Sequence, residues 1–282
     1  MKEIIAIQGA EGSNHHKVAR DFYGKTQIIE CMSFDTLVDN LLNEKATIGI
    51  MALENTIAGS IIPNYALIDN HNLQIIGEQY LNIHHHLMAL PNQKIEDIKE
   101  VCSHPMALLQ CKEFFKKYPK IKLIEDVDTA EVAKRIAQNN LKGVAAIAPK
   151  IAAEIFNLNI IEDSIQTIKE NATRFVILET KKRNHQNNSD NTIKNKNSNK
   201  ASLKFQLDHK RGSLATILNV LSDCKMNLTK IQSLPVIEAP WKYSFFVDVT
   251  FDEYQHYEKA IAIIEIMAEN LKILGAYKNG RK

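Results

Sequence analysis

One polar stretch constrains how the 282 residues of this chain can fold. Residues 181–200 read KKRNHQNNSDNTIKNKNSNK, and Ile193 is the only aliphatic residue among them. A segment of this composition cannot bury enough apolar surface to offset the entropy lost on ordering, which predicts a flexible, solvated linker. We therefore expect two domains, residues 1–180 and residues 201–282, separated by a linker at residues 181–200.

The composition is that of a globular protein and argues against several classes of partner. The chain is 45% hydrophobic and 24% charged, with a net charge of +2. Basic and acidic residues are mixed, so we expect no nucleic-acid partner. No apolar run reaches the length of a membrane span, and the first apolar run is too short for a secretory signal, which predicts a cytoplasmic protein with no membrane partner. The scattered cysteines form no C-x-x-C pair and are expected to be reduced, packed thiols.

Residues 1–180 alternate short apolar runs with helical patterns, which is typical of an α/β domain. We expect strands at residues 4–7, 47–53, 73–76, 100–103 and 144–148. Apolar residues at three- and four-residue spacing predict helices at residues 34–42, 105–118 and 129–137. Several strands run into turns that open a helix, so positive helix ends would meet at one crevice, which favours an anionic ligand.

Residues 201–282 show the order strand–helix–strand–strand–helix–strand. The strands are expected at residues 202–207, 227–234, 243–251 and 273–277. Apolar side chains from Leu214 to Leu221 mark the first helix, and a stripe from Tyr257 to Leu271 marks the second. This is the ferredoxin-like βαββαβ order, which serves many functions. Trp241, the only tryptophan, is expected to pack between the second and third of these strands.

Five short motifs occur in order along the chain, and none of them is specific alone. They are Glu54-Asn55-Thr56-Ile57-Ala58-Gly59-Ser60, Ser103-His104-Pro105-Met106-Ala107-Leu108-Leu109-Gln110-Cys111, Thr173-Arg174-Phe175, Gly212-Ser213-Leu214 and Asn227-Leu228-Thr229-Lys230-Ile231. As an ordered set they resemble prephenate dehydratase with a C-terminal ACT regulatory domain, along nearly the whole chain. The resemblance implies a periplasmic-binding-protein-like, two-lobed α/β catalytic domain followed by a ferredoxin-like ACT domain.

The resemblance also implies a reaction, the decarboxylative dehydration of prephenate to phenylpyruvate in L-phenylalanine biosynthesis. Loss of carbon dioxide and water makes the ring aromatic, so the driving force lies in the substrate and no cofactor or metal is required. The enzyme needs a proton donor at the leaving hydroxyl, donors that fix two carboxylates, and a dry pocket. No helical chorismate mutase segment precedes the first strand, so we expect a monofunctional enzyme.

Five residues are expected to take part in catalysis. The resemblance gives Thr173 the central role, a hydrogen bond to the departing hydroxyl. Asn55 can donate to a carboxylate or to the hydroxyl, and Glu54 can act as the acid if burial raises its pKa. Ser103 stands where a helix N-terminus can receive a carboxylate, and Gln110 lies two helical turns further on. A strand-end turn and a helix cap are the ordinary explanations for Asn55 and Ser103.

Further residues are expected to bind the substrate: Ser13, Thr56, His104, Arg174 and Phe175. Arg174 would supply a countercharge for a dianion and Phe175 would shape the pocket. A cap and a salt bridge remain the ordinary explanations for Thr173 and Arg174.

Two other stretches suggest ligands that we do not expect. The loop at residues 9–16 contains Ser13 but lacks the third glycine of a dinucleotide fingerprint, and its His15 and His16 receive no role. The run of residues 84–86 contains three histidines, but the middle side chain of a strand faces away from the other two, so we expect no metal there.

The resemblance places an allosteric L-phenylalanine site between two copies of the C-terminal domain. The residues implied are Gly212, Ser213, Leu214, Asn227 and Leu228. The family pattern Glu-Ser-Arg-Pro is Gln232-Ser233-Leu234-Pro235 in this chain, which predicts a weaker phenylalanine response. A lone βαββαβ unit leaves strand edges exposed, so a homodimer or homotetramer is expected.

Two alternative functions stay open. Arogenate, which has an amino group in place of the side-chain keto group, is the alternative substrate for the same chemistry. A non-catalytic ligand-binding sensor of the same fold is the alternative from another class. Joint presence of Glu54, Asn55, Ser103, Gln110 and Thr173 favours the enzyme, because a sensor has no need for a hydroxyl at the reacting centre.

Overall fold

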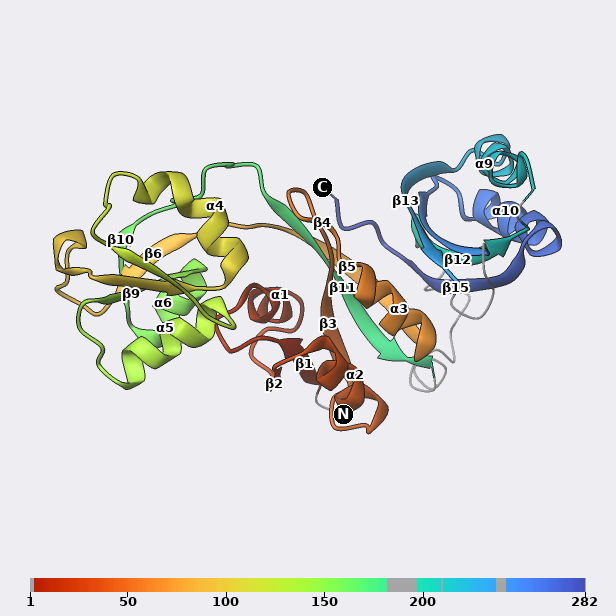
Figure 1. The fold of residues 1–282 in the computed structure, drawn as a ribbon. Coiled ribbons are helices and arrows are strands. Elements are labelled where there is room, and N and C mark those ends of the chain that lie inside the picture. Colours follow the sequence, from red (N-terminus) through yellow and green to blue (C-terminus); the bar gives the residue numbers. More distant parts are fainter. Residues whose placement is uncertain (1–2, 182–196, 209, 237–241, 282) are drawn as a thin grey trace. The chain divides into compact units, whose positions relative to one another are not determined.

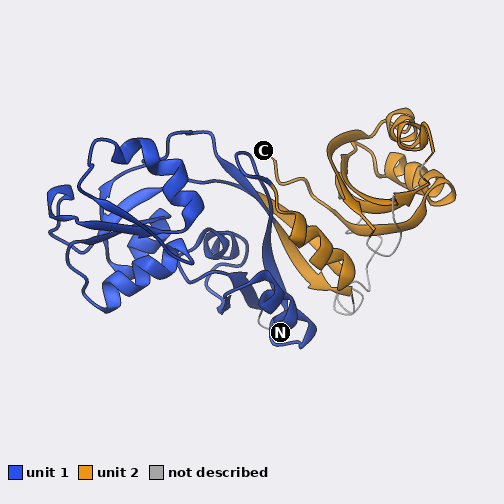
Figure 2. Cartoon of the chain, in the orientation of Figure 1, with its two compact units in different colours: residues 1–59, 80–175 blue, residues 60–79, 176–282 orange. Residues whose placement is uncertain are grey.

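The computed structural model describes residues 3–181, 197–208, 210–236 and 242–281, and Figure 1 traces the chain. The chain forms two compact units (Figure 2). Unit 1 comprises Met1–Gly59 and Tyr80–Phe175, and unit 2 comprises Ser60–Gln79 and Val176–Lys282. Unit 2 therefore groups the C-terminal part of the chain with an early segment, which the sequence pattern does not reveal. The division into domains at residues 1–180 and 201–282 stays a prediction.

The first sheet consists of β1 (Ile4–Gln8), β2 (Gln27–Cys31), β3 (Ile48–Asn55), β4 (Gly59–Ser60), β5 (Leu73–Asn82) and β11 (Ala172–Thr180). Its strand order is β2-β1-β3-β11-β5, with β4 paired to β3. Strand β1 pairs in parallel with β2 and β3. Helices α1 (Asn14–Tyr23) and α2 (Phe34–Leu42) follow β1 and β2, and α3 (Ile62–Asn70) precedes β5. The helix predicted at residues 34–42 is confirmed.

Strand β5 is longer than the sequence predicts. The apolar pattern ends at residue 76, whereas the strand runs from Leu73 to Asn82. Its later residues include Glu78, which is 3% exposed. This buried carboxylate interrupts the apolar run but not the strand, because it pairs with the charged Lys200 within unit 2.

The second sheet contains β6 (His86–Ala89), β7 (Glu100–Ser103), β8 (Lys122–Glu125), β9 (Val144–Ala148) and β10 (Asn159–Glu162), in the order β10-β6-β9-β7-β8. A short 3-10 helix, η1 (Ile95–Asp97), and helices α4 (Pro105–Phe115), α5 (Thr129–Gln138) and α6 (Lys150–Phe156) accompany it. Side chains of β9 alternate between two apolar cores: Ala145 and Ile147 pack with α4, and Ala146 and Ala148 pack with α5 and α6. Helices therefore cover both faces of this sheet.

Residues 200–277 of unit 2 form β12 (Lys200–Leu207), α9 (Ser213–Asp223), β13 (Asn227–Pro235), β14 (Tyr243–Thr250), α10 (Tyr254–Met267) and β15 (Glu269–Tyr277). The strands make an antiparallel sheet in the order β13-β14-β12-β15. Leu203, Phe205, Ile217 and Ile264 belong to its core with the two helices. The predicted βαββαβ order is confirmed.

The second helix of this unit ends earlier than predicted. The apolar stripe continues to Leu271, but α10 ends at Met267 and β15 begins at Glu269. Glu269 pairs with Gln206 of β12. An apolar residue at position 271 fits a helical repeat and a strand alternation equally well, and pairing with β12 decides between them.

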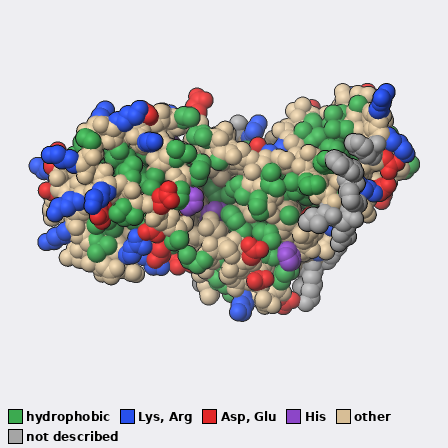
Figure 3. All heavy atoms as spheres, viewed as in Figure 1, with side chains coloured by type: hydrophobic (Ala, Val, Ile, Leu, Met, Phe, Trp, Pro, Cys, Tyr) green, Lys and Arg blue, Asp and Glu red, His purple; other side chains and the backbone are tan. Residues whose placement is uncertain are grey.

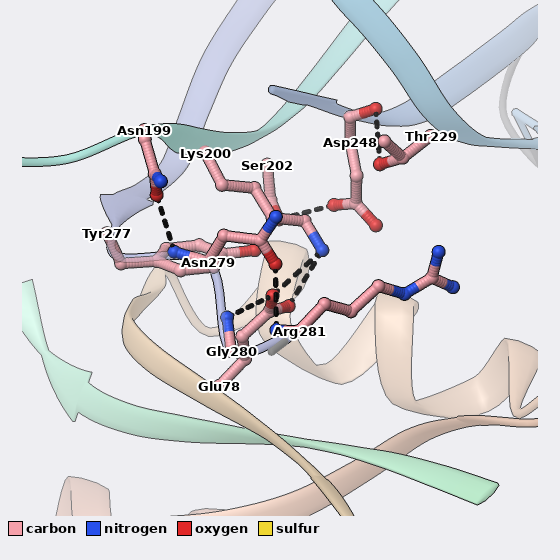
Figure 4. Close-up of polar contacts among 10 residues, drawn as sticks. All are labelled: Glu78, Asn199, Lys200, Ser202, Thr229, Asp248, Tyr277, Asn279, Gly280 and Arg281. Carbon is pink, nitrogen blue, oxygen red and sulfur yellow. Dashed lines mark hydrogen bonds and ion pairs between the residues drawn. The ribbon is translucent and has the colours of Figure 1, made fainter. Parts of the chain in front are cut away.

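The predicted linker at residues 181–200 ends inside a strand. Lys200 begins β12 and is 2% exposed. Its Nζ lies 2.9 Å from each carboxylate oxygen of Glu78 on β5, and the Gly280 N–H donates to Glu78 Oε1 at 3.0 Å (Figure 4). The prediction that Lys200 is a solvated linker residue is wrong, because a buried carboxylate pairs with it.

Parts of two further predictions lie outside the described residues. Residues 182–196 of the predicted linker lie outside the described residues, and Trp241 does too. The linker and the packing of the tryptophan therefore stay predictions.

The surface and the thiols agree with the composition. Side chains of both charges are interspersed on the face shown in Figure 3, in keeping with the net charge of +2. All four cysteines are free thiols, and three of them, Cys31, Cys102 and Cys111, are buried. Within the described ranges, no helix is both long enough and apolar enough to cross a bilayer.

Candidate active site

Unit 1 brings side chains that are far apart in sequence into one hydrogen-bonded group, which we call the amide network. Its members are Asn55, His85, Gln110, Asn171 and Thr173. Asn55 is the last residue of β3, Asn171 directly precedes β11 and Thr173 is its second residue. Gln110 is on α4, and His85 directly precedes β6. The network therefore connects residues at β3 and β11 with α4 and the residue that precedes β6, and all its members belong to unit 1.

Asn55 is oriented by the turn that follows it. Its Oδ1 accepts hydrogen bonds from the backbone N–H groups of Ile57 at 2.9 Å and Ala58 at 2.8 Å. Its Nδ2 then donates to Thr173 Oγ1 at 2.9 Å and to Asn171 Oδ1 at 2.6 Å. The backbone thus fixes which end of the Asn55 amide faces Thr173.

Gln110 binds two other members of the network, Asn171 and His85. Its Oε1 accepts from Asn171 Nδ2 at 3.0 Å and lies 2.8 Å from His85 Nε2. The Gln110 amide nitrogen has no hydrogen-bond partner among the described residues. Its two N–H groups are consequently available to a ligand.

Thr56 holds the start of β11 in place. Its backbone N–H donates to Ala172 O at 2.9 Å, and its Oγ1 accepts from Ala172 N at 2.9 Å. These bonds fix the strand residue that stands between Asn171 and Thr173. Glu54, which precedes Asn55 in β3, is half-buried.

Ser103 does not join the network. Its side chain is 0% exposed, and its Oγ donates to Ile147 O at 2.7 Å. The cap of α4 is the exposed His104, whose Nδ1 accepts from Met106 N at 3.2 Å. The expectation that Ser103 stands at the helix N-terminus is therefore wrong. Ser103 is the last residue of β7, and His104 is the N-cap of α4.

Arg174 and Phe175 occupy buried positions of β11. The Arg174 side chain is 2% exposed and has protein partners. Alternation along the strand directs it away from the face that carries Thr173 and Phe175. The Phe175 ring packs against the His15 ring at 4.9 Å between centroids. Burial lowers the pKa of His15 to about 3, so His15 is a neutral core residue that helps seat Phe175.

Ser13 and His16 order the first loop of unit 1. Ser13 caps α1 by accepting from His16 N at 3.2 Å, and Ser13 is 3% exposed. His16 Nδ1 in turn accepts from Gly12 N at 2.9 Å. The hydrogen bonds seen for these two side chains thus stay within the loop and the first turn of α1.

The residues expected to bind phenylalanine fall at two ends of the C-terminal sheet. Gly212 caps α9 in the left-handed region with a φ of 82°. Ser213 and Leu214 line a cavity of about 170 Å³ with residues that include Tyr243 at the start of β14. Asn227 and Leu228 pair with Thr250 and Val249, at the other end of β14. Within the described part of one chain, these two groups are not brought together.

Two members of the network were missed in the sequence. Asn171 directly precedes Ala172 and Thr173, and that position next to the Thr-Arg-Phe motif was the available signal. His85 was considered only as part of a histidine run. In the structure its ring points to Gln110, whereas the rings of His84 and His86 lie 6.4 Å apart. Among the described side chains, no group of three or more His, Cys, Asp or Glu residues is suited to a metal ion.

A family model and a curated relative both identify the same protein family. The family model for prephenate dehydratase matches residues 5–183. A protein of Arabidopsis thaliana named arogenate dehydratase/prephenate dehydratase 2, chloroplastic, is 34% identical over 97% of this chain and 72% of its own length.

Solved structures share the fold. A structure described as GqqA, a novel type of quorum quenching acylase, has a TM-score of 0.85 at 23% identity, covering 98% of this chain and 97% of its own. The prephenate dehydratase of Arthrobacter aurescens in complex with L-Phe has a TM-score of 0.81 at 20% identity, covering 98% of this chain and 90% of its own. At these identities the likeness concerns the fold, which does not determine the activity.

Proposed function

Because the chain belongs to the prephenate dehydratase family, and is therefore a carbon–oxygen lyase, we propose that it converts prephenate into phenylpyruvate. The ring carboxylate leaves as carbon dioxide and its bonding electrons enter the ring. The ring hydroxyl takes a proton and leaves as water. Since the aromatic product supplies the driving force, the protein must position the substrate and protonate the leaving group.

The observation that carries this proposal is the state of the Thr173 hydroxyl. Thr173 Oγ1 accepts a hydrogen bond from Asn55 Nδ2 at 2.9 Å, and no acceptor among the described residues takes its own hydrogen. The hydroxyl can therefore donate to the leaving hydroxyl of the substrate. A threonine hydroxyl is a weak acid, so Thr173 acts as a relay: its proton passes to the leaving hydroxyl and is replaced from solvent water. The Asn55 N–H stabilises the negative charge that develops on Oγ1 during this transfer.

Two groups of donors suit the substrate carboxylates. The first is the Gln110 amide nitrogen, which faces no protein acceptor among the described residues. The second is the N-terminus of α4, where His104 is exposed and the helix dipole favours an anion. We assign the carboxylates to these donors rather than to Arg174, because the Arg174 side chain is 2% exposed.

Arogenate is the second candidate substrate. The Arabidopsis relative is named for both activities. Arogenate differs from prephenate only at the side chain, where an amino group replaces the keto group, so the ring chemistry assigned to Thr173 is the same for both.

We further propose that L-phenylalanine binds the βαββαβ part of unit 2 as an effector. The Arthrobacter aurescens structure, whose fold this chain shares, contains L-Phe. The cavity beside Ser213 and Leu214 offers one half of such a site. A second copy of the chain would supply Asn227 and Leu228, which makes a homodimer the smallest assembly that completes it.

One experiment tests these assignments together. Purified protein is incubated with prephenate or with arogenate at neutral pH, and both phenylpyruvate and phenylalanine are quantified by chromatography. Prephenate should give phenylpyruvate, and arogenate turnover would appear as phenylalanine. A protein that binds either compound without releasing either product would be a sensor, and the enzymatic proposal would then be wrong. Thr173→Val, which keeps the shape and removes the hydroxyl, is the matched control.

A further inference from the structure

We propose that His85 is a positioning residue for this reaction, donating a hydrogen bond from Nε2 that holds the Gln110 amide with its N–H groups toward the substrate. The inference rests on the proposed function. It adds a residue that no motif assigns to the site and gives that residue a defined protonation form.

Asn55 determines which atom donates and which accepts in the hydrogen bonds from Asn55 through Asn171 and Gln110 to His85. Backbone N–H groups occupy Asn55 Oδ1, so Asn55 Nδ2 is a donor and the Asn171 atom that faces it is the acceptor Oδ1. Asn171 Nδ2 must then donate, and the Gln110 atom at 3.0 Å must be Oε1. An atom of His85 that lies 2.8 Å from Gln110 Oε1 can bond to it only as a donor.

The form of the His85 ring agrees with this direction. The residue is 6% exposed, and burial lowers its pKa, so the ring is neutral and carries one N–H. The network requires that hydrogen on Nε2. The other nitrogen, Nδ1, is buried and has no hydrogen-bond partner among the described residues.

Backbone bonds fix the place from which His85 donates. The His85 N–H donates to Gln166 Oε1 at 3.0 Å, and His85 O accepts from Ile165 N at 2.8 Å. The backbone carbonyl of Gln110 accepts from Thr167 N at 2.9 Å. Residues 165–167 thus hold both partners of the His85–Gln110 bond, so the bond does not depend on the ligand to form.

The consequence concerns the two orientations of the Gln110 amide. In the observed orientation Oε1 accepts from His85 and Asn171, and the N–H groups stay free for the substrate. In the flipped orientation the N–H groups would face two donors, and the substrate carboxylate would face an oxygen. With His85 removed, Asn171 alone would oppose the flip, so a smaller fraction of the enzyme would be competent.

Two substitutions separate this role from packing. His85→Gln keeps an N–H donor near the position of Nε2, and His85→Met fills the buried space without a donor. We expect His85→Met to lower kcat/KM about tenfold and His85→Gln to lower it less than about threefold. Thermal unfolding by circular dichroism monitors the fold of both variants. Equal losses in two folded variants would overturn the proposal.

A double-mutant cycle and a spectrum complete the test. In a Gln110→Ala background, His85→Met should cause no further loss, because His85 acts only through Gln110; additive losses would refute this. Nitrogen-15 NMR of the histidine rings, with the His85→Gln spectrum as the assignment control, should show His85 protonated at Nε2 alone near pH 7. A His85 ring protonated at Nδ1 would overturn the proposal even in an active enzyme. A wild-type protein inactive on both substrates refutes the proposed function itself, whereas additive losses in an active one refute only the role of His85.

Discussion

Replacing Lys200 with methionine should destabilise unit 2, because the change removes the buried positive charge that pairs with the Glu78 carboxylate. The Lys200 side chain is 3% exposed and the Glu78 side chain is 0% exposed. Lys200 Nζ contributes two hydrogen bonds of 2.9 Å, and Gly280 N–H contributes a third of 3.0 Å. Methionine keeps much of the volume of the lysine stem and removes both Nζ bonds.

The magnitude follows from the burial of both partners. Removing one partner of a buried ion pair costs about 3–5 kcal/mol of unfolding free energy. The bond from Gly280 N–H remains, so we expect a loss near the lower end, about 3 kcal/mol. The double variant Glu78→Met/Lys200→Met removes both charges and leaves the Gly280 N–H without this acceptor, for which about 1–2 kcal/mol is expected. The double variant should therefore be more stable than Lys200→Met alone.

Urea denaturation at neutral pH, followed by circular dichroism, measures these differences. The exposed pair Lys17–Asp21, with side chains 43% and 38% exposed, provides the matched control. Lys17→Met should cost less than about 0.5 kcal/mol. The reasoning would be refuted by a Lys200→Met protein as stable as the Lys17→Met protein, or by a double variant less stable than Lys200→Met.

Three other outcomes are expected. Thr173→Ala should lower kcat about 100-fold, a barrier increase of about 2.7 kcal/mol, with an unchanged melting temperature; wild-type turnover would remove Thr173 from the mechanism. Limited proteolysis should cut first within residues 181–199 and leave an N-terminal fragment that keeps some dehydratase activity without a phenylalanine response, and protection of this stretch would contradict the two-domain division. Calorimetry should detect phenylalanine binding at millimolar ligand, and Gly212→Ala, strained at a φ of 82°, should weaken it without changing uninhibited turnover. No heat from the wild-type protein would mean that the effector site is absent.

Local patterns predicted most of the helices and strands, because the hydrophobic periodicity of a helix or a strand can be recognised within a short run of adjacent residues. The βαββαβ order and the helix at Phe34–Leu42 are examples. Errors arose where a distant partner decided the outcome. Glu78 is compatible with a buried strand because Lys200 and the Gly280 N–H bind its carboxylate, and Leu271 belongs to a strand because β15 pairs with β12. Neither pairing is visible in a window of adjacent residues.

The site shows the same limit. Asn55, Gln110 and Thr173 were expected to act together, and the structure places them in one network. Ser103 was expected to stand beside them, but whether a serine caps a helix or ends a strand depends on one residue of register. His85 could not be predicted as a site residue from the sequence, because its link to the site is a hydrogen bond to Gln110, 25 residues further along the chain.

The separation between Glu78 and Lys200 also bears on how this protein is made. The two residues are 122 positions apart in the chain. At the pace of ribosomal synthesis, about 5–20 residues per second, Glu78 is exposed to the cell for roughly ten seconds before Lys200 is made. During that interval the Glu78 carboxylate lacks the lysine that will pair with it, and water must solvate it. Unit 2 consequently cannot be completed until the chain has grown through residues 80–175, which form the larger part of unit 1. The nascent polypeptide thus carries Glu78 without its Lys200 partner while 122 of the 282 residues are added, and this is the interval in which a chaperone would have most to protect.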